Sequence, residues 1–364
     1  MKFNTLVRPL LLAAAATAGT VAVAQSAPPA APGAAAQQVV TAAQNVIIDR
    51  ALLTAFQALP PRFEDKKNPI TPDKVALGRM LYFDTRLSKN QDLSCNSCHD
   101  LNKFGVDNQP TSTGHKKQLG GRNSPTVYNA GGALTQFWDG RAPNLEEQAK
   151  GPILNPVEMA MPSAEHVVAT LKSIPGYVSS FQKAYPGEAE PVTYDNMARA
   201  IGAFERQLVT PSRFDKYLAG DEKALSEAEK GGLKTFLSQG CQNCHGGAAI
   251  GGSLQRLGLI VPFQSKDQGR FELTKNEQDR MIFRVPTLRN VTQTGPWFHD
   301  GSVKNLQDAV KIMAQHQVGK LLTDDDAKGI VTFLGSLTGE LPREYIGKPA
   351  LPPSGPNTPK PDPS

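Results

Sequence analysis

Cys95-Asn96-Ser97-Cys98-His99 is one of two pentapeptides that decide the fold of this chain, and the other is Cys241-Gln242-Asn243-Cys244-His245. Both have the form Cys-x-x-Cys-His, which is the attachment motif of c-type haem. The two thiols of such a motif form thioethers with the haem vinyl groups, and the histidine binds the iron. All four cysteines of the chain lie in these motifs. The sequence therefore predicts two covalently bound haem c groups.

Paired cysteines also occur in zinc ribbons and in redox-active dithiols. A zinc ribbon has its cysteine pairs about 15–20 residues apart, whereas more than a hundred residues separate Cys98 from Cys241. A thioredoxin-like dithiol needs no histidine after its second cysteine, and the chain has only six histidines. Both observations favour haem.

The N-terminus has the features of an export signal. Lys2 and Arg8 give it a basic start, residues 10–24 are apolar, and Ala22-Val23-Ala24 resembles a cleavage site. We expect a cleaved signal peptide over residues 1–24 and a periplasmic protein, since haem c is attached outside the bacterial cytoplasm. An uncleaved anchor is the alternative, although this stretch is short for a membrane span. No membrane span is expected in the mature chain.

The remaining sequence is expected to form two haem units between an Ala/Pro-rich leader (25–44) and a proline-rich tail (348–364), which we expect to be extended or disordered. Residues 45–210 would hold the first haem and residues 211–347 the second, with the boundary near Thr210-Pro211-Ser212. The net charge of +5 comes without a basic run interleaved with aromatics, so nucleic-acid binding is not indicated.

Helical patterns accompany each motif. Thr71-Pro72 predicts a helix start, after which Ala76, Met80 and Phe83 fall on one face. The capping box Ser226-x-x-Glu229 precedes inward-facing Leu233 and Phe236.

A last helix is predicted from the Thr323-x-x-Asp326 box, with apolar residues at helical spacing: Ile330, Phe333, Leu334 and Leu337. Strand patterning is weak. We therefore predict a mainly α fold of two tandem cytochrome c-like haem domains with long loops.

The sixth ligand of each iron decides what that haem does. For the second haem, Met281 and Met313 both lie downstream of His245. Met313 is favoured because it lies in the loop-to-helix region just before the closing helix, where a cytochrome c fold brings a thioether over the haem. A histidine–methionine haem has a high reduction potential. The alternative is that either methionine simply fills the core.

His115 is the candidate distal ligand of the first haem. It lies in a Gly-flanked polar loop sixteen residues after His99. As a ligand it would give a haem of lower potential than the second, and a mobile loop could release it to open a coordination site. The alternative is a solvated loop histidine. His166 and His316 are expected to be surface or packing residues.

Taken together, the motifs resemble those of the bacterial di-haem cytochrome c peroxidases, over residues 71–339. In the first half the matching segments are 93–99 (LSCNSCH), 105–108 (GVDN), 114–115 (GH), 122–126 (RNSPT), 136–141 (QFWDGR), 147–152 (EQAKGP) and 156–159 (PVEM). In the second half they are 241–245 (CQNCH), 285–290 (VPTLRN) and 298–301 (FHDG).

The resemblance implies a division of labour between the haems. His99 would be the proximal ligand of the peroxidatic haem, and His115 its distal ligand in the oxidised resting state. Reduction of the high-potential His245/Met313 haem would release His115 and open the first iron to hydrogen peroxide.

The resemblance also implies roles for residues away from the iron. Glu158 matches the distal acid–base carboxylate, with Gln148 beside it, and Trp138 matches the tryptophan between the haems. A carboxylate that moves a proton between the peroxide oxygens is typically worth about 10²–10⁴-fold in rate.

A calcium site between the domains is implied as well, from the Asn123 side chain and the carbonyl oxygens of Thr294 and Pro296, with His299 near by. Calcium prefers such oxygen ligands.

The predicted activity is the reduction of hydrogen peroxide with electrons from a small periplasmic cytochrome c or a blue-copper protein, entering at the second haem. Two alternatives remain. One is a di-haem electron carrier whose irons both stay six-coordinate. The other is a MauG-type oxidase, in which a tyrosine takes the place of the second haem's methionine. A homodimer is implied by the resemblance alone.

Overall fold

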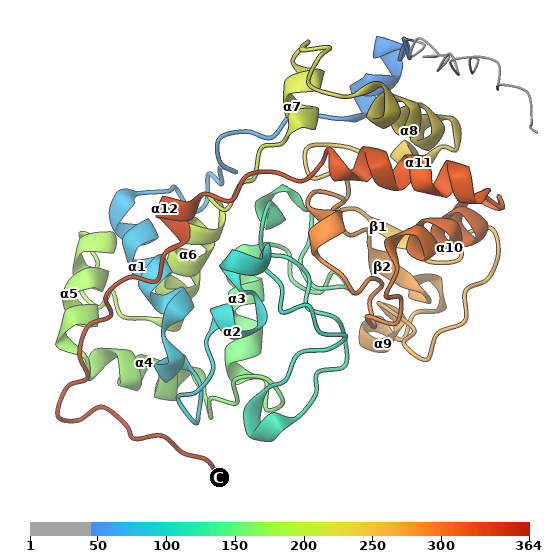
Figure 1. The fold of residues 1–364 in the computed structure, drawn as a ribbon. Helices are drawn as coiled ribbons and strands as arrows, with labels where there is room; N and C mark the ends of the chain where they lie inside the picture. The colour runs from blue at the N-terminus through green and yellow to red at the C-terminus, as the bar shows by residue number, and fades with distance from the viewer. Residues whose placement is uncertain (1–44) are drawn as a thin grey trace, which may run out of the picture. The chain divides into compact units, whose positions relative to one another are not determined.

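The computed structural model describes residues 45–364, so the predicted signal peptide and the leader lie outside the described residues. Within the described range the chain is mainly helical (Figure 1). The helices are α1 (Pro72–Phe83), α2 (Cys95–Cys98), α3 (Leu145–Leu154), α4 (Ala164–Lys172), α5 (Pro175–Ala184), α6 (Tyr194–Glu205), α7 (Arg213–Leu218), α8 (Glu227–Ser238), α9 (Phe271–Thr274), α10 (Leu306–Val318), α11 (Asp324–Gly335) and α12 (Arg343–Ile346).

The sheet content described is one short antiparallel pair, β1 (Leu254–Arg256) and β2 (Ile282–Arg284), with Leu254 opposite Arg284. The predicted mainly α fold is confirmed. Across residues 45–364, no helix combines the length and the apolar character that a membrane span requires.

The three predicted helix starts are confirmed. Thr71, Ser226 and Thr323 each accept a hydrogen bond from the N–H three residues further on, at the starts of α1, α8 and α11. The apolar side chains predicted to face inward are buried, namely Leu233 and Phe236 on α8, Ile330, Phe333 and Leu334 on α11, and Leu337 just after α11.

The side of α1 that carries Ala76, Met80 and Phe83 is only partly buried. Phe83 is buried, Met80 packs partly buried against a hydrophobic cluster and Ala76 is exposed, while Leu77 is fully buried. The cause is the way α1 crosses α6. A Cβ on Gly78 would lie 1.9 Å from the carbonyl oxygen of Ala200, so the two backbones touch at this glycine and the helix turns its Gly78 side inward.

The same crossing recurs in the second half of the chain. A Cβ on Gly232 of α8 would lie 1.9 Å from the carbonyl oxygen of Gly329 in α11, and Figure 1 shows these two helices side by side. In each pair an aromatic residue four positions after the contacted carbonyl packs on the glycine, Phe204 in one and Phe333 in the other. Since α1 and α8 each precede a Cys-x-x-Cys-His motif, both halves are built on one plan.

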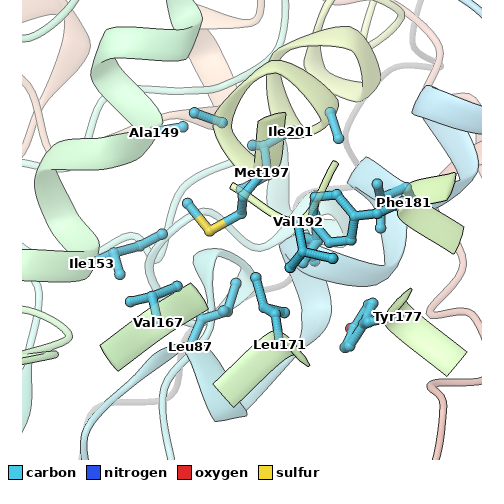
Figure 2. Packing of buried hydrophobic residues seen from close by; sticks show 14 of the residues in the cluster. Leu87, Ala149, Ile153, Val167, Leu171, Tyr177, Phe181, Val192, Met197 and Ile201 are labelled. Atoms are coloured by element: carbon cyan, nitrogen blue, oxygen red, sulfur yellow. The ribbon is translucent and has the colours of Figure 1, made fainter. Parts of the chain in front are cut away.

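Two main hydrophobic clusters hold these units. Figure 2 shows the Met197 side chain of α6 among Ile153, Val167 and Leu171 in the cluster of the first half. The cluster of the second half forms around α8 and α11 and includes Phe214.

Each end of the described chain packs against the half that is distant from it in sequence. Leu53 and Phe56 pack in the second-half cluster, whereas Ile346 packs against Tyr82 and Phe204 of the first half. The domain limits 45–210 and 211–347 therefore remain a prediction, and the hydrophobic cores do not follow them at either end.

The α8–α11 crossing gives a stability prediction. Gly232→Ala should lower the free energy of unfolding by about 1–3 kcal/mol, the usual cost of overpacking, because the new methyl group would meet backbone that cannot move aside. Chemical denaturation measures this. Gly231→Ala is the matched control, since a Cβ there meets nothing within 4 Å and should be neutral or stabilise by up to about 1 kcal/mol. Equal effects of the two substitutions would contradict the close crossing.

Candidate haem centres and distal site

The second Cys-x-x-Cys-His motif lines a mostly apolar cavity of about 320 Å³. Cys241, Cys244 and His245 lie on its wall, and so does Met313. The Nδ1 atom of His245 lies 3.4 Å from the carbonyl oxygen of Ile250, which leaves Nε2 as the metal-binding nitrogen. Desolvation lowers the pKa of His245 to about 4, so the imidazole is neutral, which is its metal-binding form.

The two candidate methionines lie in different surroundings. Met313 is on the cavity wall with His245, whereas Met281 packs with Trp138 and Phe283 in a separate cluster. The expectation that Met313 lies in a loop-to-helix region was wrong, because it lies well inside α10. Of this helix Ala309 and Ala314 are buried, and its apolar side, which also includes Leu306 and Val310 at helical spacing, lines the cavity.

Arg284 is a cavity residue that the sequence did not single out. It is 5% exposed, and its Nε donates to the carbonyl oxygen of Phe137 at 3.2 Å. Among residues 45–364 it forms no ion pair, and desolvation lowers its pKa to about 10. A buried cation without a counter-charge suits an acidic group such as a haem propionate. The cysteines and histidine of the second motif and this buried cation together fit a haem. The sequence signal that could have identified Arg284 is its position directly before the 285–290 motif.

The first motif lies on a short helix against a hydrophobic cluster. Its cysteines open and close α2, and Cys95 packs against the cluster that contains Tyr82. The Tyr82 hydroxyl donates to the carbonyl oxygen of His99 at 2.6 Å, and Ser124 Oγ lies 3.2 Å from His99 Nδ1. Desolvation lowers the pKa of His99, which keeps the ring neutral. These residues also fit an attached haem.

His115 and Glu158 are brought together. The His115 N–H donates to the carbonyl oxygen of Glu158 at 2.8 Å. A Cβ on Gly114 would lie only 2.0 Å from the carbonyl oxygen of Val157, so the two loops are in backbone contact. His115 is 6% exposed, which excludes the alternative of a solvated loop histidine.

The Glu158 carboxyl group is half-buried and accepts a hydrogen bond from Asn155 Nδ2 at 2.8 Å. Desolvation raises its pKa, against the opposing effects of Arg141 and of the Asn155 hydrogen bond. Desolvation raises the pKa of Cys98 in the first motif to about 11, and the charge of Glu158 adds to this rise. Gln148 is half-buried on α3, and no hydrogen bond links it to Glu158 in the described chain.

Trp138 is 8% exposed and lines the cavity that His245 also lines, together with Ser124, which contacts His99. Its Nε1 donates to the carbonyl oxygen of Asn123 at 2.8 Å. The Asn123 N–H in turn donates to the carbonyl oxygen of His299 at 2.7 Å, so a short chain of contacts joins the halves.

The three predicted calcium ligands line this same cavity. Asn123 Nδ2 donates to the carbonyl oxygens of Gln109 at 2.9 Å and Pro110 at 3.3 Å, which leaves Oδ1 as a free acceptor. Over residues 45–364 the carbonyl oxygens of Thr294 and Pro296 accept no hydrogen bond. This set of amide and carbonyl oxygens fits a hard cation.

Comparison with known proteins was made on this basis. A family model described as di-haem cytochrome c peroxidase matches residues 72–223. Cytochrome c551 peroxidase of Pseudomonas aeruginosa is 49% identical over 315 residues, which cover 84% of this chain and 90% of the relative. The protein of that name from Nitrosomonas europaea is 47% identical, with 81% and 88% covered.

More distant relatives match as well. Methylamine utilization protein MauG of Methylorubrum extorquens is 36% identical over 66% of this chain and 69% of the relative. The crystal structure of a MauG-like protein associated with microbial copper homeostasis matches with a TM-score of 0.72 and 27% identity, over 80% of this chain and 97% of that one. The chain therefore belongs to the di-haem cytochrome c peroxidase family and is a peroxidase-type oxidoreductase that uses two haem groups.

Proposed function

We propose that this chain reduces hydrogen peroxide to water at the first haem, with electrons that enter at the second. The observation that carries the proposal is the contrast between the two sites. The loops that carry His115 and Glu158 are joined by a main-chain hydrogen bond, and the Glu158 charge acts on Cys98 of the first motif, whereas Met313 lines the cavity of the second. An acid–base group is needed where peroxide reacts, and a thioether suits a high-potential electron carrier.

Both haems would be held covalently, by Cys95 and Cys98 in the first half and by Cys241 and Cys244 in the second. His99 and His245 would be the proximal ligands, and each haem would supply a redox-active iron. Arg284 would neutralise a propionate group.

Glu158 would carry the proton transfer. Its partly desolvated carboxyl group, with a raised pKa, is suited both to accept a proton from the near oxygen of peroxide and to deliver it to the leaving oxygen. Gln148 would help to orient the substrate. His115 would close the site in the resting state and leave it when the second haem is reduced.

Met313 and Trp138 would serve electron transfer. Met313 would complete the second haem as a high-potential centre, and Trp138 would relay electrons toward His99. The cavity is lined by no tyrosine from the described residues, which argues against the MauG-type alternative.

The electron donor would be a small cytochrome c or a blue-copper protein in the periplasm. The relatives' names mention cytochrome c551, which makes a c-type donor the first to test. A homodimer remains a prediction. Calcium would bind Asn123, Thr294 and Pro296, where it would stiffen the contact chain around Trp138.

A spectroscopic redox titration followed by peroxide addition tests this proposal. Half-reduction should convert the first haem from low-spin to high-spin, and peroxide should then be turned over. A near-infrared thioether band in the ferric protein should mark Met313. His115→Gly should be high-spin and active without prior reduction, with His166→Ala on the surface of α4 as the control. A half-reduced protein without high-spin haem or turnover would instead be an electron carrier.

Glu158→Gln should lower turnover at least ~100-fold while both haems stay bound, because the amide cannot take up the proton. Steady-state peroxide consumption and haem content measure the two effects. Glu165→Gln, an exposed carboxyl group on α4, is the matched control and should keep full activity. Near-normal activity of Glu158→Gln would remove this residue from the mechanism.

Asn123→Ala should weaken calcium binding at least ~10-fold, through the loss of one oxygen ligand. Calorimetric titration of chelator-treated protein measures this. Asn102→Ala is the control, since Asn102 is an exposed residue of the same half. Calcium uptake unchanged by Asn123→Ala would exclude this side chain as a ligand.

A further inference from the structure

The proline-rich tail (residues 348–364) is extended and bonded along the first half of the chain. Figure 1 shows it running past α5 after α12. Arg86 Nη2 donates to the carbonyl oxygen of Pro352 at 2.9 Å, and Gln91 Nε2 donates to that of Pro359 at 2.8 Å. Between these points Ser173 Oγ bonds Thr358 Oγ1 at 3.0 Å, and Thr358 is 8% exposed. Specific polar contacts therefore hold the tail in one course.

This course brings the last residues of the tail to His115. The Nε2 atom of His115 lies 3.3 Å from the main-chain oxygen of Ser364. Lys89 Nζ donates to the same oxygen at 2.8 Å and to Ser364 Oγ at 3.1 Å. Lys89 also pairs with the Asp362 carboxylate at 3.5 Å, and its carbonyl oxygen accepts from the Asp362 N–H at 3.0 Å. Lys89 thus fixes the oxygen that faces the imidazole.

Lys89 belongs to the distal site through its main chain as well. Its N–H donates to the carbonyl oxygen of Met159 at 2.9 Å, one residue after Glu158. His115 N–H is bonded to Glu158 itself. One lysine therefore connects the tail, the carboxyl loop and the histidine loop.

The main-chain oxygen of Ser364 acts as a hydrogen-bond acceptor, so contact with it requires a proton on Nε2 of His115. Coordination of a metal through Nε2 requires the lone pair of that same atom. The two contacts of this nitrogen exclude each other.

We propose that Lys89 and residues 360–364 position the released form of His115, with the main-chain oxygen of Ser364 as the acceptor for its imidazole. This inference rests on the proposed function, in which His115 is the ligand that leaves. Lys89 acts as a positioning residue and holds the acceptor in place.

Lys89→Met keeps the length of the side chain and removes its donors. In the half-reduced holoenzyme, the ratio of high-spin to low-spin first haem should fall at least ~5-fold, as expected from the loss of an ordered hydrogen bond for the released imidazole. Electron paramagnetic resonance and visible spectra measure this ratio, and the fully oxidised spectrum should not change. A chain that stops at Pro359 should behave in the same way, which covers the case that Lys89→Met fails to fold.

Lys172→Met is the matched control. Lys172 forms an exposed ion pair with Glu190 on the same half and should leave the spin ratio unchanged. In a His115→Gly background, Lys89→Met should have no further effect on the spin state, since no imidazole remains to be positioned.

The outcomes separate the two proposals. A wild-type protein that stays low-spin on half-reduction would overturn the proposed function. A wild-type protein that converts, with Lys89→Met and the shortened chain converting equally far, would overturn the positioning role alone. A spin-state effect of Lys89→Met that persists without His115 would also overturn it.

Discussion

The hydroxyl group of Thr210 is the point on which the two halves depend. It is fully buried and accepts hydrogen bonds from Asn129 Nδ2 at 2.8 Å and Asn290 Nδ2 at 2.9 Å. Both asparagines have positive φ, 59° and 61°, and both end a Pro-Thr-x-x-Asn segment. From Asn129 the chain continues to Trp138, and from Asn290 to Pro296. The Thr210 hydroxyl oxygen therefore anchors the residue at which each of these cavity-lining loops begins. Leaving either buried amide unpaired would cost about 1–3 kcal/mol.

The two loops that begin at these asparagines are similar in sequence but carry different side chains. The loops after the asparagines repeat the sequence Phe-x-Asp-Gly, with positive φ at Phe137 and Phe298. Trp138 occupies the middle position in one half, and His299 the same position in the other. Their rings are 6.4 Å apart in an edge-to-face arrangement. The backbone plan is common to both halves, and the differences that matter for chemistry lie in side chains placed on it.

The sequence predicted features that depend on local chemistry. The Thr71 cap and the buried Leu233 were predicted because a helix start and an apolar period need only neighbouring residues. The buried side of α1 could not be predicted, because it is set by the approach of Gly78 to Ala200, more than a hundred residues later. The contact of Ser364 with His115 could not be predicted for the same reason, since it depends on the course of the whole tail.

The helix around Met313 shows a second limit. Its apolar residues Leu306, Ala309 and Val310 have the spacing of an ordinary core helix, so the sequence does not reveal that this side lines a cavity. The resemblance had marked the 122–126 motif, which contains Asn123. The hydrogen bonds that Asn123 makes could not be predicted from that motif.

The tail also connects the two sites along the chain, but its packing interrupts this connection. Ile330 and Leu334 of α11 line the cavity with His245, and the chain then continues through α12 to the tail. Ile346 of α12, however, is 2% exposed in a first-half cluster, so the tail is anchored to the first half before it reaches His115. Asn123 provides a shorter connection, because its carbonyl oxygen accepts a hydrogen bond from Trp138 and its N–H donates to the carbonyl oxygen of His299 in the other half.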